Sequence, residues 1–192
     1  MPSVQEFNRL PADAAGQALR RCCSSGRWID AVLAGRPYPD MEALLAASDA
    51  AVAVLSEGDL DEAMAGHPRI GGHSPAAGRG ATASSGGADQ EPVGWSSREQ
   101  AGVSCAGDEL RQALADGNAA YEQRFGHIYL ACATGRNAAE LLTFLRSRLG
   151  NDRETEWAVV VSELAKINQV RLRKLLDGEI ASGTGASEGD ES

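Results

Sequence analysis

The feature that most constrains this chain is a series of apolar stripes with helical spacing, each starting just after a residue suited to cap a helix. Asp40, Asn137, and Asn151 or Asp152 stand at three such starts. Asp and Asn side chains can accept hydrogen bonds from the first free N–H groups of a helix. The longest stripe recurs every three or four residues and comprises Trp157, Val160, Leu164, Ile167, Arg171 and Leu175. Such stripes predict helices rather than strands.

The same kind of pattern covers most of the chain. Residues 128–133 are a short apolar run whose periodicity does not separate a strand, an extended connector and a buried helix. The sequence predicts one all-α domain of about eight helices over residues 1–177. The expected helices lie near residues 11–23, where Pro11 stands in the first turn, 28–33, 41–55, 57–66, 96–103, 110–125, 138–149 and 153–176.

Two segments lack the apolar residues needed for a packed core. Residues 72–94 are rich in Gly, Ser and Ala, and they cannot bury enough surface to offset the entropy of ordering. They predict a flexible insertion, which could act as a lid on a neighbouring site. Residues 178–192 consist largely of Gly, Ser and acidic residues and predict a disordered acidic tail.

Composition narrows the classes of function. The net charge of −9 over 192 residues argues against a general nucleic-acid-binding surface and against binding to an anionic membrane. No run approaches the ~18 apolar residues of a membrane span, and the N-terminus lacks a basic segment followed by an apolar one. The four cysteines match no metal motif, so we expect reduced thiols in a cytoplasmic protein.

A histidine on a stiffened turn is the first candidate for chemistry. His67 follows a helical pattern that ends at Gly66, and Pro68 comes directly after it. Proline fixes its own φ and disfavours helical dihedrals in the preceding residue. The turn therefore holds an imidazole beside the guanidinium of Arg69. The alternative is an ordinary loop with a surface histidine and with Arg69 as a structural ion-pair partner.

An arginine within the last apolar stripe is the second candidate. Seven residues rotate a helix by about two full turns, so Arg171 lies almost in line with Leu164. A guanidinium at such a position must be paired or must bind something, because unpaired burial of a charge is costly. Arg171 either extends its charge to the helix end or pairs with an acidic residue, or it faces a pocket for an anionic substrate.

Three segments together resemble one known family. They are residues 67–71 (His-Pro-Arg-Ile-Gly), residues 95–102 (Trp-Ser-Ser-Arg-Glu-Gln-Ala-Gly) and residues 125–136 (Phe-Gly-His-Ile-Tyr-Leu-Ala-Cys-Ala-Thr-Gly-Arg). This order is similar to that of the 2-oxo-4-hydroxy-4-carboxy-5-ureidoimidazoline (OHCU) decarboxylases, the last enzymes in converting urate to S-allantoin. The resemblance extends over roughly residues 5–176. It implies an all-α, cofactor-free and commonly dimeric enzyme that acts on a small anionic ureidoimidazoline.

By matching position, the resemblance also implies roles for individual residues. His67 would be the catalytic acid/base, and Glu99 would help it to hold the substrate hydroxyl. No metal ligand is implied. The substrate-binding residues would be Pro68, Ser96, Gln100, Arg171 and backbone groups of His127, Ile128, Tyr129, Leu130 and Ala131.

The chain also departs from the family pattern. Gly72 and His73 stand where the family usually has an acidic residue, and the link to Trp95 is longer and richer in glycine. A degenerate homologue that keeps the helical body as a binding or scaffold module is therefore an alternative, although a scaffold has no need of His67, Glu99 and Arg171 together. A hydrolase of a related ureido compound ranks last, since the sequence offers no nucleophile with its base and no metal site.

Overall fold

The computed structural model describes residues 3–70 and 107–179, which form eight α-helices and a π-helical turn and contain no strand. The all-α fold expected from the sequence is confirmed. The predicted helix near 96–103 and the insertion at 72–94 lie outside the described residues. The helices are α1 (Val4–Arg9), α2 (Ala12–Arg20), α3 (Gly26–Ala34), α4 (Met41–Ala53), α5 (Glu57–Ala65), α8 (Asp108–Phe125), α9 (Ala138–Arg148) and α10 (Arg153–Lys174), followed by η1 (Leu175–Glu179).

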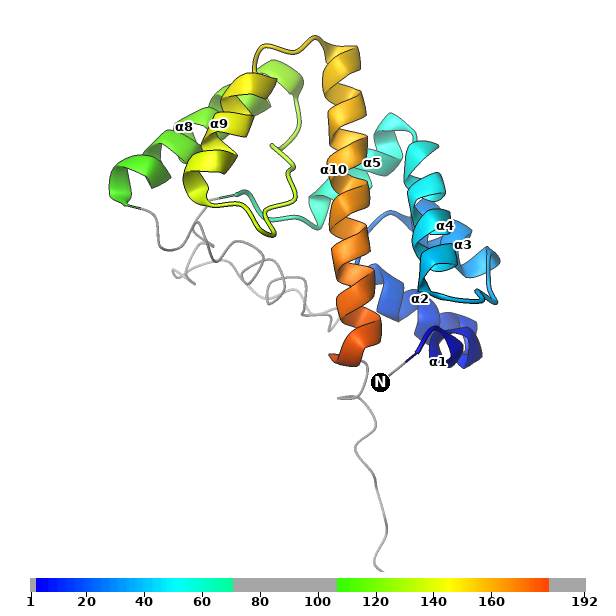
Figure 1. Ribbon diagram of the computed structural model, residues 1–192. Coiled ribbons are helices and arrows are strands. Elements are labelled where there is room, and N and C mark those ends of the chain that lie inside the picture. The colour runs from blue at the N-terminus through cyan, green and yellow to red at the C-terminus, as the bar shows by residue number, and fades with distance from the viewer. Residues whose placement is uncertain (1–2, 71–106, 180–192) are drawn as a thin grey trace, which may run out of the picture.

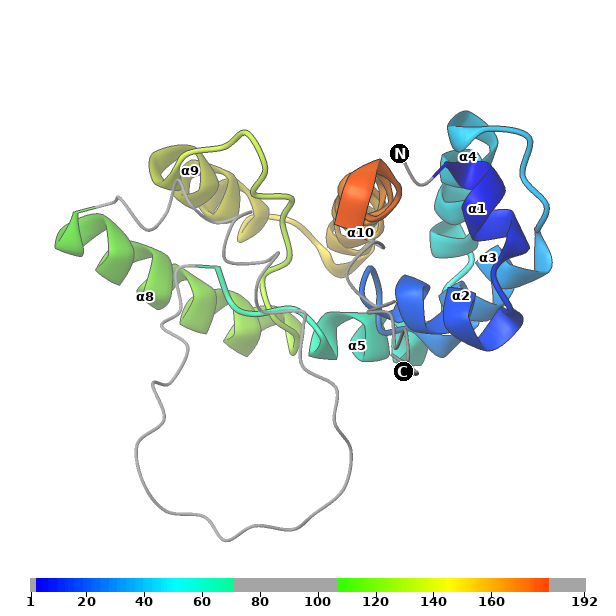
Figure 2. The same ribbon diagram turned by 90° about the horizontal axis from the view of Figure 1, so that it is seen from below.

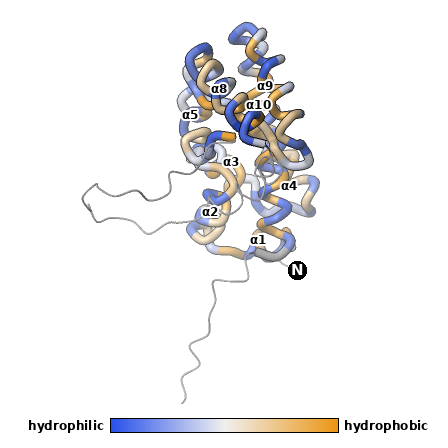
Figure 3. Tube along the Cα trace, turned by 90° about the vertical axis from the view of Figure 1, so that its left-hand side faces the viewer, coloured by the Kyte–Doolittle hydropathy of each residue, from blue (hydrophilic) through white to orange (hydrophobic). Residues whose placement is uncertain are grey.

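The long helix α10 stands between two groups of helices. Helices α1 to α4 lie on one side of it, the pair α8 and α9 lies on the other, and α5 crosses behind it (Figures 1 and 2). Along the helices, hydrophobic positions alternate with hydrophilic ones (Figure 3), as expected where each helix buries one side. No helix among the described residues has the length and apolar content to cross a membrane.

Each group has its own apolar core. The first core joins α1 to α5 with α10 and η1, and its largest member, Trp28, is fully buried and donates a hydrogen bond to Ser48 Oγ (3.2 Å). The second core joins α8, α9 and the connector between them (residues 128–133), together with Ile70. Helices α8 and α9 approach closely at Gly117, where a Cβ would lie 2.8 Å from a methyl group of Leu145.

Most helix boundaries lie where the sequence placed them, because the capping side chains bond as expected. Asn137 Oδ1 accepts the N–H of Glu140 (3.0 Å), and Glu140 Oε2 accepts the N–H of Asn137 (2.8 Å). Asp152 Oδ1 accepts the N–H of Thr155 (2.7 Å) at the start of α10. Gly126 ends α8 with a φ of 85°, a left-handed conformation that favours glycine.

The structure differs from the sequence prediction at both ends and settles one open segment. Helix α2 starts after Pro11 as expected, but the separate short helix α1 before it was not predicted. Leu10 between them takes extended dihedrals, as prolines impose on the preceding residue. The helical region continues as η1 to Glu179, past the predicted start of the tail at residue 178, and residues 180–192 lie outside the described part. Residues 128–133 form an irregular connector.

A buried ion pair joins the second group of helices to α10. The side chains of Arg148 on α9 and Glu156 on α10 are each about 1% exposed, and Arg148 Nε and Nη2 donate to Glu156 Oε1 at 2.8 and 2.5 Å. Arg148 Nη2 also donates to the hydroxyl of Tyr121 on α8 (3.0 Å), which itself donates to Glu156. Arg148 Nη1 donates to the carbonyl of Leu130 (2.6 Å). One guanidinium thus ties α8, α9, α10 and the connector together.

Replacing Arg148 by methionine should lower the free energy of unfolding by about 3–5 kcal/mol, because Glu156 would remain buried without its cation. The measurement is urea unfolding followed by circular dichroism at pH 7. Arg153→Met is the matched control, since Arg153 pairs with Glu57 in solvent and exposed pairs contribute less than about 1 kcal/mol. Equal losses in the two variants would contradict a central role for the buried pair.

Candidate functional site

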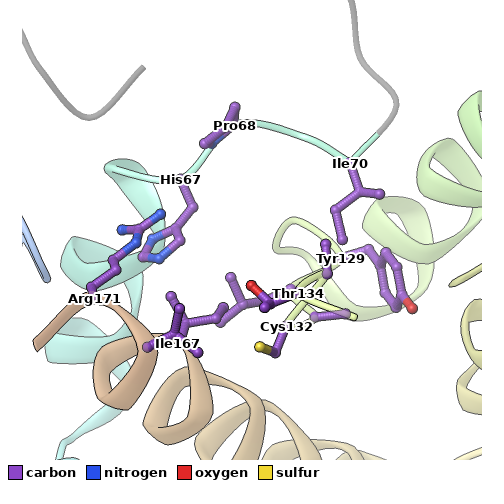
Figure 4. Close-up of a pocket in the computed structure, with 12 residues that line it drawn as sticks. His67, Pro68, Ile70, Tyr129, Cys132, Thr134, Ile167 and Arg171 are labelled. Atoms are coloured by element: carbon purple, nitrogen blue, oxygen red, sulfur yellow. The ribbon is translucent and has the colours of Figure 1, made fainter. Parts of the chain in front are cut away.

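A pocket of about 410 Å³, including its open mouth, lies where the end of α5, the connector and the second half of α10 meet (Figure 4). The turn after α5 forms one wall, the connector forms the second and α10 forms the third. Its lining residues are His67, Pro68, Ile70, Tyr129, Leu130, Ala131, Cys132, Ala133, Thr134, Ile167, Val170 and Arg171.

The turn after α5 fixes the imidazole of His67 at this pocket. The N–H of His67 donates to the carbonyl of Met64 (2.9 Å), and His67 Nδ1 lies 2.9 Å from the carbonyl oxygen of Ala63. A carbonyl only accepts, so Nδ1 carries the proton and Nε2 carries the lone pair in the neutral ring. Nε2 is buried and has no hydrogen-bond partner within the described residues. Nε2 can therefore accept a proton or a hydrogen bond from a ligand in the pocket.

The surroundings of His67 keep its ring uncharged. Burial, together with the positive charge of Arg171, lowers the pKa of His67 from 6.5 to about 4, although the hydrogen bond to Ala63 acts in the opposite direction. At neutral pH the ring is thus a neutral base.

Arg171 lies beside His67 and supplies a positive charge to the pocket (Figure 4). Its side chain is 3% exposed, and Nη1 donates to the carbonyl of Cys22 between α2 and α3 (3.1 Å). Of the alternatives that the sequence left open, the structure therefore places the guanidinium at a pocket wall rather than out in solvent. A neutral histidine next to a held cation suits an anionic ligand with a proton to give up.

Contacts with α8 hold the turn after α5 from outside the pocket. Arg69 makes a two-point ion pair with Glu122, with Nε–Oε1 and Nη2–Oε2 distances of 2.6 and 2.8 Å. Asn118 Nδ2 donates to the carbonyl of Ile70 (2.8 Å). The interpretation of Arg69 as a structural ion-pair partner is confirmed.

Buried charges also hold the connector. Besides the bond from Arg148 to Leu130, Glu163 Oε2 on α10 accepts the N–H of Cys132 (2.8 Å). Arg136 Nη1 (3.1 Å) and Lys166 Nζ (2.6 Å) donate to the same carboxylate. Burial opposes the ionisation of Glu163, but the bonds from Lys166 and Cys132 outweigh it and lower the pKa.

The structure brings together six of the predicted site residues and separates others. His127 lies at a different pocket, against Glu57 and Trp157, and Ile128 packs on the first core. The predicted residues Ser96, Glu99 and Gln100 lie outside the described part of the chain, so their roles stay predictions. The six residues that meet at the pocket are His67, Pro68, Tyr129, Leu130, Ala131 and Arg171.

Several pocket residues were missed by reasoning from the sequence. Ile167 stands four residues before Arg171 and three before Val170 on the same helix, so helical spacing could have placed both at the pocket. Cys132, Ala133 and Thr134 directly follow Ala131 within the segment 125–136, but the resemblance gave them no role. Within residues 3–70 and 107–179, no group of three or more His, Cys, Asp or Glu side chains could hold a metal ion.

Known proteins share the sequence pattern and the fold. The family described as OHCU decarboxylase matches residues 8–173. An OHCU decarboxylase of Amia calva is 30% identical over 174 residues, which are 91% of this chain and 90% of that protein. The uric acid degradation bifunctional protein TTL of Arabidopsis thaliana is 27% identical over 154 residues, or 80% of this chain, and the match spans only 45% of that protein.

Two solved structures share the fold. A crystal structure of an OHCU decarboxylase in the presence of (S)-allantoin has a TM-score of 0.66 and 21% identity, and it covers 84% of this chain and 99% of its own. A crystal structure of an (S)-allantoin synthase has a TM-score of 0.65 and 18% identity, and it covers 91% of this chain and 54% of its own.

Fold and site together define an all-α protein whose pocket combines a neutral histidine with a buried arginine. With the match over residues 8–173, this chain belongs to the OHCU decarboxylase family. The family and the decarboxylase class predicted from the sequence are confirmed.

The lowered pKa of His67 should make folding stability depend on pH. The unfolded chain binds a proton at His67 below about pH 6.5 and the folded chain only near pH 4, so stability is lost as the pH falls between these values. From pH 7 to pH 4.5 this group should remove about 2 kcal/mol from the free energy of unfolding. His67→Gln should lack that component, and urea unfolding of both proteins at the two pH values measures it. Parallel losses in both proteins would contradict the assignment.

Proposed function

We propose that this protein catalyses the cofactor-independent decarboxylation of 2-oxo-4-hydroxy-4-carboxy-5-ureidoimidazoline to (S)-allantoin in urate degradation. Membership of the OHCU decarboxylase family supports the reaction. The observation that carries it most directly is the buried Nε2 of His67, which has no partner among the described residues and lies beside Arg171 in the pocket.

The substrate makes few demands on the enzyme. The carbon that loses CO₂ bears a hydroxyl group and a carboxylate, and it stands next to a ring C=N. When the C–C bond to the carboxylate breaks, its electron pair forms a C=C bond and the C=N electrons move to nitrogen, which takes a proton from solvent. The chemistry then needs only a group that removes the hydroxyl proton and protonates the neighbouring carbon from one face.

A neutral His67 suits both parts of that task. Nε2 can accept the hydroxyl proton as the enol becomes a carbonyl, and the same nitrogen can return it to the adjacent carbon. Delivery from one side of the ring would fix the S configuration. We assign the partner role at the hydroxyl to Glu99, with Ser96 and Gln100 at the substrate, as the family resemblance implies.

Arg171 would hold the anion in place before the bond breaks. The fork of a guanidinium can bind both oxygens of a carboxylate, and Nη1 is itself held by the carbonyl of Cys22. The connector would meet the uncharged part of the substrate, where backbone N–H and C=O groups pair with ring and ureido amides. Neutral His67 adds no second positive charge that would stabilise the carboxylate against loss of CO₂.

The optical activity of the product tests this reaction. The substrate is generated in situ from urate with a urate oxidase and a hydroxyisourate hydrolase, and circular dichroism is recorded over time. The wild-type protein should give a rapid (S)-allantoin signal, and His67→Asn should reduce kcat by about 100-fold or more. A slow racemic product that the protein leaves unchanged would refute the proposed function. Near-wild-type kinetics of His67→Asn would refute the role of His67.

Arg171 should act mainly in substrate binding. Arg171→Gln should raise KM roughly 10- to 100-fold, because a charge-assisted contact to the carboxylate is lost. The control is Arg173→Gln, two residues further along α10 on an exposed site, which should leave KM within about twofold. Thermal unfolding of both variants separates binding from stability. An unchanged KM in folded Arg171→Gln would contradict the assignment.

Two further features are proposed. The family resemblance supports a homodimer, which light scattering coupled to size-exclusion chromatography would test, and the cysteine pattern supports a cytoplasmic location. We also propose that the domain ends near residue 177.

A further inference from the structure

Two buried charged side chains grip the connector from outside the pocket. Arg148 Nη1 donates to the Leu130 carbonyl (2.6 Å), and Glu163 Oε2 accepts the Cys132 N–H (2.8 Å). Both charged side chains are about 1 to 2% exposed, and neither lines the pocket. The two gripped groups belong to the two peptide bonds that flank Ala131.

The planarity of those peptide bonds carries the effect to the pocket. Both are trans, since the cis bond within the described residues is Arg36–Pro37, and the C=O and N–H of a trans peptide point in opposite directions. Arg148 therefore turns the N–H of Ala131 away from itself, and Glu163 turns the C=O of Ala131 away in the same manner. Ala131 lines the pocket, and its two backbone groups form no hydrogen bond within the described residues.

The burial of the Glu163 carboxylate is costly, so the contacts that it makes there need a structural explanation. Glu163 could serve α10 alone, but Lys166 and Arg136 already bond to it from the protein surface. Its bond to Cys132 is the contact that reaches the connector. A backbone donor and a backbone acceptor set side by side suit a ligand with an amide or ureido group, which carries both complements.

We propose that Arg148 and Glu163 are positioning residues that orient the N–H and C=O of Ala131 toward the ureido or ring amide of the substrate. The inference rests on the proposed function for the identity of that substrate. Neither residue touches the reacting carbon, so both should act on substrate affinity more than on the chemical step.

Two neutral side chains of similar length isolate the contribution of Glu163. Glu163→Gln and Glu163→Met both remove the ion pairs with Arg136 and Lys166, but only glutamine can still accept the N–H of Cys132. Glu163→Met should raise KM about tenfold over Glu163→Gln, with a smaller change in kcat. Both variants are assayed well below their melting temperatures. Equal KM values, whether raised or not, would overturn the proposal, because the ion pairs or the packing would then be responsible.

Two controls separate this outcome from other failures. Lys166→Gln removes one ion pair and leaves the bond to Cys132, so its KM should stay near that of the wild type. Wild-type protein without any decarboxylase activity would refute the proposed function rather than the positioning role.

A measurement on the unmutated protein covers the case in which Glu163→Met does not fold. Amide hydrogen exchange by NMR, with (S)-allantoin as the probe, reports the N–H groups of Cys132 and Ala131 separately. The Cys132 amide should be protected in the free protein, and the Ala131 amide should gain protection only when the probe binds. An Ala131 amide that exchanges at the same rate with and without saturating probe would overturn the inference.

Discussion

The geometry of this protein depends on one buried ion pair. Arg148 and Glu156 are withdrawn from solvent with Tyr121, and the guanidinium also holds the carbonyl of Leu130. Burial alone would disfavour both charges, and the bonds within the cluster compensate for it. Burial opposes the charge of Arg148, but the bond to Glu156 and the charges of the neighbouring acidic groups together outweigh it and raise the pKa of Arg148. The two cores share no helix among the described residues, so this cluster fixes the spacing between α10, which belongs to the first core, and the helices α8 and α9 of the second. The pocket lies where the two groups meet.

The electrostatics of the pocket depend on the few charged and polar groups around His67. His67 has a carbonyl at Nδ1 and a guanidinium nearby, and among the described residues the pocket lining contains no carboxylate. Burial and the guanidinium favour the neutral ring and outweigh the carbonyl at Nδ1, which acts in the opposite direction. A substrate that enters with negative charge would reverse part of this effect, because an anion near the imidazole stabilises its protonated form. The ring can therefore be a base in the free enzyme and a better proton carrier once the substrate is bound.

Sequence reasoning succeeded where the signal is local. Caps such as Asn137 and Asp152 set helix starts, Pro68 marked the turn of His67, and a charge within an apolar stripe marked Arg171. Glu156 and Glu163 lie on the same stripe, so the spacing argument that marked Arg171 also predicts that both acids are buried. Their partners could not be found in this way, since Arg148, Leu130 and Cys132 come from other elements. The π-helical end and the short helix α1 depend on packing, which periodicity does not encode.

Helix α10 carries Glu156, Glu163, Ile167 and Arg171 at intervals of seven, four and four residues, all on one side of the cylinder. These residues meet the ion pair, the connector, the pocket wall and the neutral histidine in turn, over about 22 Å of helix. The relative positions of these four side chains therefore depend on an unbroken helical register. One inserted or deleted residue within this span would rotate everything beyond it by about 100° and separate the cation from the groups it serves. Substitutions on the outer side of the helix leave this register unchanged, whereas a change of length between Glu156 and Arg171 destroys it.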